Sequence, residues 1–209
     1  MTTEERRAQW WRWRWVLLLP VALLLVLVAT ASRLQLFWWP DQLSDETSGQ
    51  LGVPVEVVDR WTDEDENEQE RRFTVTLVDV RPATTVEGFS GPERVAPPEG
   101  VAVWEIVLEF AADPDVPLGQ CEVSLFDTEG REAQAQGGSV GDVYLPSTAC
   151  EPENRKGPGY DGSRDDEALP RLPTYRVAVF AITAADAVPA SVRLWWEPTD
   201  YVQMDLTER

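Results

Sequence analysis

The feature that most constrains this chain is an uncharged run of 18 residues between Arg14 and Arg33. A helix rises about 1.5 Å per residue, so the run would cover roughly 27 Å, close to the roughly 30 Å hydrocarbon thickness of a bilayer. No polar stripe marks a second face, as it would on the surface helix of a globular domain. We therefore predict a single transmembrane helix over residues 15–39, preceded by a cytoplasmic tail over residues 1–14.

Tryptophan gathers at both ends of this predicted helix, where indole rings favour the membrane–water interface. Arginine stands among the tryptophans at the N-terminal end, at a depth where it can pair with lipid phosphates. Membrane lipid is therefore an expected partner of this segment. The predicted interfacial residues are Trp10, Trp11, Arg12, Trp13, Arg14, Trp15, Trp38 and Trp39.

Charge predicts the orientation of the chain. Residues 1–14 hold four arginines and two glutamates, whereas residues 41–209 hold 13 Lys and Arg against 35 Asp and Glu, a net charge of −22. Because short cytoplasmic segments carry the basic residues, we expect a single-pass protein of the plasma membrane with its N-terminus in the cytoplasm and its C-terminal part outside. The alternative is a secreted form, since Ala29-Thr30-Ala31 fits a signal-peptide cleavage pattern.

The two cysteines, Cys121 and Cys150, both fall in the part predicted to be exported. An even number of cysteines in an oxidising compartment favours a disulfide. The chain has no histidine, so a Cys–His nucleophile is excluded. We expect a Cys121–Cys150 bond that closes a long loop.

Period-two alternation of apolar and polar residues recurs after a Pro/Gly/Ser-rich linker over residues 40–52. This pattern, broken by Gly, Pro and Asp, predicts an antiparallel β-sandwich over residues 53–205. One predicted strand places three apolar residues on one face, namely Phe73, Val75 and Leu77. Another does the same with Ile106, Leu108 and Phe110. The predicted strands are 55–58, 73–80, 101–110, 121–127, 174–183, 191–197 and 201–204.

Three stretches interrupt the strand pattern. The acidic run 63–70 predicts a loop, because like charges repel. Residues 81–100 and 128–173 are rich in Pro and Gly and are predicted to be irregular, with a short hairpin near 131–136 or 140–145 in the second. Loops on a rigid sandwich commonly carry binding sites. The alternative is an acidic flap without a function.

The segments WEIVLEF (104–110), CEVSLFDTEG (121–130) and YRVAVF (175–180) resemble telokin-like, immunoglobulin-fold domains that follow a membrane anchor in Gram-positive bacteria. The resemblance covers roughly residues 53–205 and implies an immunoglobulin-like sandwich with an extracytoplasmic binding or assembly role. It supplies no catalytic residue. Arginine occurs 17 times and lysine once, which favours a GC-rich coding sequence as in actinobacteria.

The sequence therefore predicts a tethered interaction module of the cell envelope rather than an enzyme. No catalytic set, cofactor motif or metal-ligand spacing stands out, and the acidic balance argues against nucleic acid. A membrane or envelope protein is the expected partner. The alternative function is a cell-surface sensor that binds a ligand or cation through its acidic loops.

Overall fold

The computed structural model describes residues 20–29, 43–62, 67–88, 91–135, 137–146, 149–160, 162–164, 169–197 and 199–207. The chain divides into two units, Met1–Gln42 and Leu43–Arg209. Within the first unit, residues 20–29 form a helix. None of the described helical residues forms a segment long and apolar enough to cross a bilayer. The predicted interfacial tryptophans and arginines lie outside the described residues.

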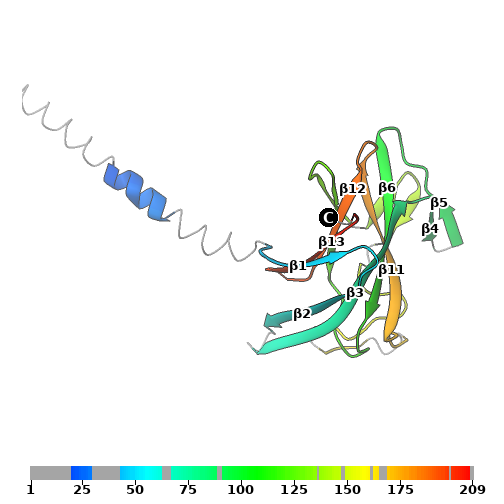
Figure 1. Ribbon diagram of the computed structural model, residues 1–209, viewed down its shortest axis with the longest axis horizontal. Helices are drawn as coiled ribbons and strands as arrows, with labels where there is room; N and C mark the ends of the chain where they lie inside the picture. Colours follow the sequence, from blue (N-terminus) through cyan, green and yellow to red (C-terminus); the bar gives the residue numbers. More distant parts are fainter. Residues whose placement is uncertain are drawn as a thin grey trace, which may run out of the picture. The chain divides into compact units, whose positions relative to one another are not determined.

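The second unit is a β-sandwich, as predicted (Figure 1). One sheet has the strand order β1-β13-β12-β7-β8 and the other β11-β6-β3-β2. Two further pairs, β4-β5 and β10-β9, form separate hairpins. The strands are β1 (Asp45–Gln50), β2 (Val55–Thr62), β3 (Glu68–Pro82), β4 (Thr85–Gly88), β5 (Gly91–Arg94), β6 (Val101–Ala111), β7 (Glu122–Asp127), β8 (Glu132–Gln134), β9 (Gly138–Val140), β10 (Val143–Leu145), β11 (Thr174–Ala184), β12 (Pro189–Trp195) and β13 (Asp200–Asp205).

The main core lies between the two sheets, because the inward side chains of both belong to one buried cluster. The alternation read from the sequence is confirmed: Val75, Leu77, Ile106, Leu108 and Phe110 are all fully buried. They face side chains of the other sheet, among them Val123, Leu125, Val192, Leu194 and Met204. Inward burial of alternate residues on two facing sheets is the arrangement that stabilises a sandwich.

The acidic run 63–70 is not a loop throughout, which corrects the prediction. Glu68, Gln69 and Glu70 belong to β3, and Arg60 of β2 lies opposite Glu70 in the antiparallel register. The Glu70 carboxylate accepts hydrogen bonds from Arg60, at 3.1 Å, and from Arg72, at 2.7 Å. Two arginines therefore neutralise the charge of Glu70, at the end of the run that enters the strand. Residues 63–66 lie outside the described residues.

Six residues of the predicted linker, Asp45–Gln50, form the edge strand β1. This strand pairs with β13 in parallel, so the first and last strands lie side by side and the sheets are not antiparallel throughout. No side chain of β1 is buried. A Cβ on Gly49 would overlap Val55, so glycine permits the close approach of β1 to β2. The sequence analysis did not predict β1 because its residues are polar. A strand that is held mainly by backbone hydrogen bonds shows no apolar alternation.

The two stretches predicted to be irregular contain short hairpins. The β4–β5 hairpin lies within 81–100, and within 128–173 the β9–β10 hairpin occupies 138–145 while β8 pairs with β7. Both hairpins contribute to a second apolar cluster on the β11 side of the sandwich, separate from the main core. Its buried members are Ala83, Val86, Val95, Val103, Val140, Leu145 and Phe180.

Candidate functional site

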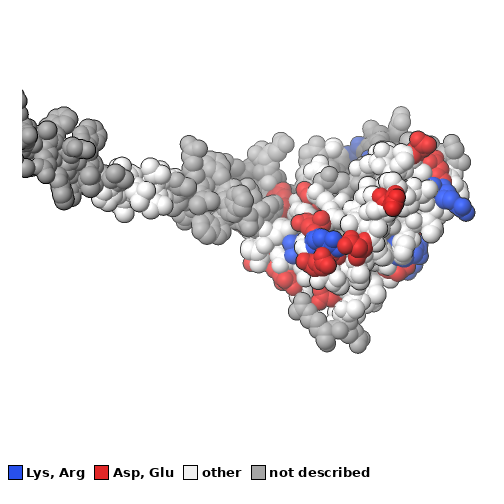
Figure 2. All heavy atoms as spheres, turned by 90° about the horizontal axis from the view of Figure 1, so that it is seen from above, with Lys and Arg blue, Asp and Glu red and all other residues white. Residues whose placement is uncertain are grey.

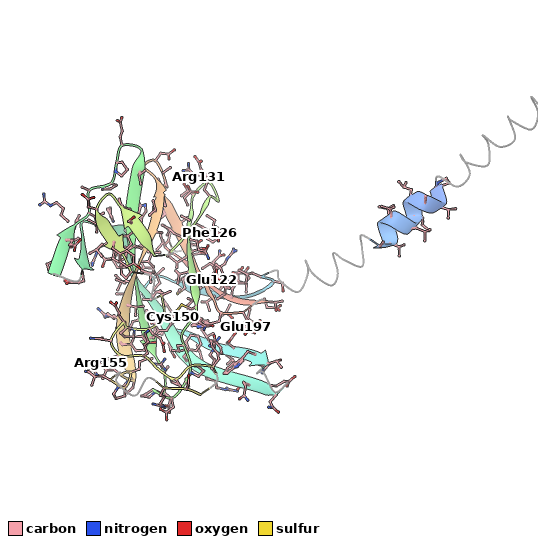
Figure 3. The ribbon with its side chains drawn as sticks, turned by 180° about the vertical axis from the view of Figure 1, so that it is seen from behind. Glu122, Phe126, Arg131, Cys150, Arg155 and Glu197 are labelled. Carbon is pink, nitrogen blue, oxygen red and sulfur yellow. A yellow bond between two sulfur atoms is a disulfide. The ribbon has the colours of Figure 1, made fainter. Side chains whose placement is uncertain are left out.

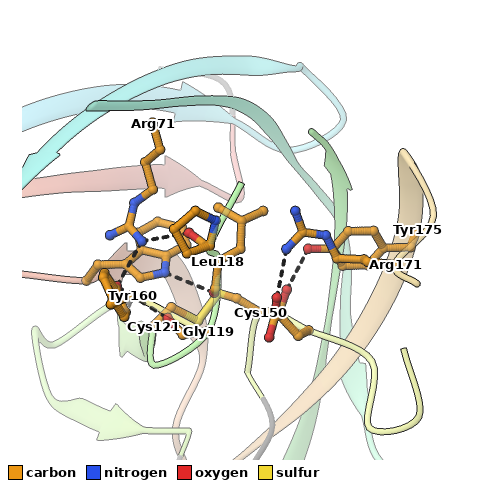
Figure 4. The surroundings of a disulfide bond; sticks show 11 residues. Arg71, Leu118, Gly119, Cys121, Cys150, Tyr160, Arg171 and Tyr175 are labelled. Carbon is orange, nitrogen blue, oxygen red and sulfur yellow. Dashed lines mark hydrogen bonds and ion pairs between the residues drawn. A yellow bond between two sulfur atoms is a disulfide. The ribbon is translucent and has the colours of Figure 1, made fainter. Parts of the chain in front are cut away.

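The disulfide predicted from the sequence is confirmed. Cys121 immediately precedes β7, and Cys150 lies in the long segment before β11, with their Cα atoms 5.9 Å apart. Both residues are buried within the main core cluster. The bond therefore fixes the long segment to the sheet, and Figure 4 shows a buried arginine on either side of it.

Arg71 of β3 is the first of these arginines, and its side chain is fully buried. Its Nε and Nη2 contact Oδ2 of Asp59 at 2.7 and 2.6 Å. Its Nη1 donates to the carbonyl of Pro117, at 2.9 Å, and to the hydroxyl of Tyr160, at 2.8 Å. Arg71 thus joins three segments that are distant in the sequence.

Three aromatic rings surround the same guanidinium. The centroids of Trp61, Tyr160 and Trp196 lie 5.1, 5.1 and 4.7 Å from its central carbon. Such contacts add cation–π attraction where the charge is desolvated. Trp196 is itself held by a hydrogen bond from its Nε1 to the carbonyl of Leu118, at 3.0 Å. The aromatic cage is therefore already occupied by a cation of the protein.

Arg171 is the second buried arginine and anchors the long segment by different contacts. Its Nη1 donates to Glu151 Oε1 at 2.7 Å, and its Nη2 donates to the carbonyls of Asp113 and Val116 at 2.8 and 2.6 Å. Glu151 Oε1 also accepts a hydrogen bond from the backbone of Gly157, at 2.9 Å. Because charge-assisted hydrogen bonds are about twice as strong as neutral ones, the segment is tied firmly to the sandwich.

Burial has marked effects on ionisation near these arginines. It raises the pKa of the Asp59 carboxyl, and the charge and hydrogen bonds of Arg71 offset part of that rise. It also raises the pKa of Tyr160. The pKa of Tyr175, whose hydroxyl donates to the carbonyl of Cys150 at 2.7 Å, is raised well above its ordinary value by burial. Both tyrosines are therefore neutral donors at physiological pH.

A groove of about 1210 Å³ opens beside this network. Its walls are the end of β2, the start of β3, and residues from the segments 115–120, 158–164 and 196–197. Glu197, which is labelled in Figure 3, belongs to this wall. Gln120, in the wall, has a φ of 60°, and among the described residues it alone combines a positive φ with a side chain beyond glycine. The groove is thus built by the segments that the arginines and the disulfide hold.

The groove wall carries three carboxylates, of Glu70, Asp115 and Glu197. Glu70 is paired with Arg60 and Arg72, and Asp115 with Arg164. Glu197 is exposed and forms no ion pair with a residue in the described ranges. Figure 2 shows acidic and basic side chains close together on one face of the sandwich.

Cation binding by the acidic loops remains a prediction. Within the ranges that the structure describes, no three Asp, Glu or Cys side chains are grouped to hold a metal ion. Residues 63–66, 161 and 165–168, which belong to the acidic stretches, lie outside those ranges. The sequence-predicted functional residues brought together by the structure are therefore the two cysteines.

The sequence analysis missed both buried arginines, although the sequence does contain a signal for Arg71. Arg71 stands two positions before Phe73 in the alternation of β3, and Asp59 stands between Val57 and Trp61 in that of β2. Both are inward positions. A charged residue at an inward position on each of two predicted neighbouring strands indicates a buried ion pair, since buried charges require partners.

No protein-family model and no curated protein sequence matches this chain. Among solved structures, it is similar to an uncharacterised β-sandwich protein from Clostridium difficile 630, with 9% sequence identity and a TM-score of 0.36. The similarity covers 79% of this chain and 97% of that protein.

Proposed function

We propose that this protein is a non-catalytic binding protein of the cell envelope, tethered to the plasma membrane by its N-terminal segment, with the acidic sandwich outside the cell. The observation that carries the proposal is the helix over residues 20–29. Its large apolar side chains point in every direction, and all of them are exposed by more than half. They are Val21, Leu23, Leu24, Leu25, Val26, Leu27 and Val28. Lipid would cover such a surface, which water disfavours.

The disulfide supports the extracytoplasmic location of the sandwich. Disulfides form and persist in oxidising compartments and are rare in the cytosol. The net charge of −22 over residues 41–209 supports the same orientation, because the short N-terminal segment then carries the basic residues on the cytoplasmic side. An envelope protein with complementary basic surface is the partner that this charge favours.

The finer resemblance, to telokin-like immunoglobulin-fold domains of Gram-positive membrane proteins, belongs to this proposal. Two facing sheets support it, as does the turn at the segment DTEG. In that turn Asp127 accepts hydrogen bonds from the backbone of Glu129 and Arg131, and Gly130 adopts a φ of 78°. Glycine takes this conformation without the strain that a Cβ would add.

Fractionation of cells that express the full chain tests the tether. We expect the intact polypeptide in the membrane fraction, released by detergent but not by high salt or carbonate. N-terminal sequencing distinguishes the alternative, since a secreted form would begin after residue 31. A soluble, intact chain in the cytosol with both cysteines reduced would contradict the proposal.

Crosslinking in intact membranes followed by purification of the full chain tests the binding role. We expect one envelope protein to be recovered in stoichiometric amount. Recovery of no partner from the membrane-bound chain would count against an interaction module.

A further inference from the structure

Strand β2 lies at the end of the four-stranded sheet and has one edge without a partner strand. It pairs with β3 on one side, and no described strand pairs with its other side (Figure 1). A hollow of about 400 Å³ lies along this free edge, lined by Val57–Arg60 and by the start of β1. Every second residue of a strand directs its backbone N–H and C=O groups toward a given edge, so this edge presents unpaired donors and acceptors.

The other edge strands of the two sheets are poorer templates for pairing. Strand β8 has three residues, and the charged residues of β1, Asp45 and Glu46, are both acidic. Strand β11 has one charged residue, Arg176, which already pairs with Glu109 of β6. On these strands no pattern of opposite charges would fix the register of an added strand.

The outward face of β2 has a charge pattern that matches a second copy of itself. Its exposed residues alternate with buried ones and are Glu56, Val58, Arg60 and Thr62. If two copies pair antiparallel about Val58, each Glu56 lies opposite Arg60 of the other copy. The two valines then lie opposite each other, between two pairs of opposite charge. Such a ladder would include Val55–Trp61 of both strands.

The residues that would meet at this edge can accept further partners. Glu56 is exposed and forms no ion pair with a residue that the structure describes. Arg60 is 71% exposed and shares the Glu70 carboxylate with Arg72, so Glu70 keeps one arginine if Arg60 turns to another carboxylate. Val58 is a large apolar side chain with 37% of its surface exposed, and its burial would be favourable.

We infer that the free edge of β2 pairs with the same edge of a second copy of this chain. The pairing joins two four-stranded sheets into one continuous sheet with two-fold symmetry. A two-fold interface uses the same patch on both subunits, as the Glu56 and Arg60 pairs require. Backbone hydrogen bonds give such an added strand its affinity, and side chains fix its register. The inference goes beyond the proposed function and does not depend on the membrane tether.

Disulfide crosslinking of the full chain in detergent micelles tests the register. The Cα atoms of the two copies of Val58 would lie about 4.5–5.5 Å apart, a distance that a disulfide spans. Val58→Cys should therefore form a covalent dimer on mild oxidation. Thr62→Cys is the matched control, since it lies on the same exposed face but roughly 27 Å from its copy in this register. Crosslinking of Thr62→Cys as readily as of Val58→Cys would overturn the inference.

Sedimentation velocity of the full chain in micelles, over a series of protein concentrations, tests the charge pairs. We expect dimers whose dissociation constant rises with salt. Arg60→Glu should raise that constant about tenfold, because two like-charge contacts replace two ion pairs. The double variant Glu56→Arg/Arg60→Glu should restore it, because the exchanged charges again lie opposite each other.

Arg94→Glu is the control for net charge, since Arg94 is exposed on β5, away from this edge. It should leave the dissociation constant nearly unchanged. An equal effect of Arg94→Glu and Arg60→Glu would overturn the inference, because it would indicate general repulsion between acidic chains. A chain that stays monomeric, or a dimer that Arg60→Glu leaves intact, would overturn it as well. Cell fractionation tests the membrane tether separately, so these results leave that proposal unchanged.

Discussion

Two regions of the sandwich hold added chain in place by different chemistry. The β4–β5 and β9–β10 hairpins rest on an apolar cluster around Leu145 and Phe180. The segment from Cys150 to β11 instead is fixed by a disulfide and by Arg171, beside the Arg71 network. We call the first the apolar cluster and the second the arginine network. The apolar cluster secures hairpins, whereas the arginine network secures the wall of a groove.

Apolar contacts and buried ion pairs differ in how strictly they fix the positions of the residues that they join. Apolar contacts are non-directional, so side chains of similar volume can replace one another at a cost below about 1.5 kcal/mol. A buried guanidinium must direct each N–H to an acceptor, and the loss of one partner leaves a buried charge. The arginine network therefore fixes the positions of the segments it joins more tightly than the apolar cluster does. It is also open to disturbance by reductant and pH, to which the apolar cluster is indifferent.

The largest effect is expected from breaking the buried pair of Arg71 and Asp59. Arg71→Met should lower the free energy of unfolding by about 3–5 kcal/mol, because it leaves the Asp59 carboxylate buried and unpaired. Urea unfolding of the full chain in micelles, followed by tryptophan fluorescence, measures this loss. The double variant Arg71→Met/Asp59→Leu should recover most of it. A loss below about 1 kcal/mol in the single variant would show that the pair is not a fixed anchor.

The disulfide is expected to contribute slightly less. Cys121→Ser together with Cys150→Ser should cost about 3–4 kcal/mol, since the bond closes a loop over a sequence separation of 29. Reductant should lower the stability of the wild-type chain by a similar amount and leave the double serine variant unchanged. If the wild-type chain unfolds at the same urea concentration with and without reductant, the bond does not stabilise the network.

A cavity in the apolar cluster provides the contrasting test. Leu145→Ala should cost about 3 kcal/mol because Leu145 is fully buried, while the volume-conserving Leu145→Met should cost less than about 1.5 kcal/mol. The difference between wild type and Leu145→Ala should be the same with and without reductant. If Leu145→Ala lost more stability in the reduced protein than in the oxidised protein, the two regions would be energetically coupled. That result would contradict the contrast between them.

A smaller loss is expected at Gly157, against which Arg171 and Glu151 pack. An added Cβ would lie 2.7 Å from Arg171 Nη1 and 2.8 Å from Glu151 Oε1. Gly157→Ala should therefore cost about 1–3 kcal/mol through the shift it forces on the ion pair. Gly138→Ala is the control, because a Cβ there meets nothing within 4 Å. Equal stability of the two variants in urea would mean that the ion pair tolerates displacement.

The smallest effect concerns the β7–β8 turn, outside both regions. Burial acts to raise the pKa of Asp127, but hydrogen bonds from Arg131 and Glu129 lower it on balance. Its ionised form therefore stabilises the fold above its ordinary pKa, and that contribution is lost as pH falls through the lowered value. Asp127→Asn should be slightly less stable than wild type at neutral pH, and the difference should shrink as the pH falls through the lowered pKa of Asp127. A difference that persists in acid would contradict the assignment.

The sequence predicts the strands better than the parts that shape the groove. The apolar alternation correctly predicts the buried faces of two strands. The buried residues are Phe73, Val75 and Leu77 in one and Ile106, Leu108 and Phe110 in the other. Alternation marks strands that bury side chains, so it identifies the sandwich. It fails for β1, whose side chains are all outside the core, and for hairpins too short to show a period.

The groove could not be predicted because it depends on contacts between distant segments. Arg71 reaches Pro117 and Tyr160, and Arg171 reaches Asp113 and Glu151. No local pattern specifies which acceptors a buried guanidinium will meet. The cysteine pair was the exception, because two cysteines in a region predicted to be exported leave one possible pairing.

Protease treatment of intact cells that express the chain with a different tag at each end tests the central claim most directly. The claim is that lipid surrounds the helix over residues 20–29 while the sandwich lies outside the cell. We predict that external protease removes the C-terminal tag, while the N-terminal tag stays protected and sediments with membranes. A C-terminal tag that is degraded only after lysis, or an N-terminal tag that is cut in intact cells, would contradict it.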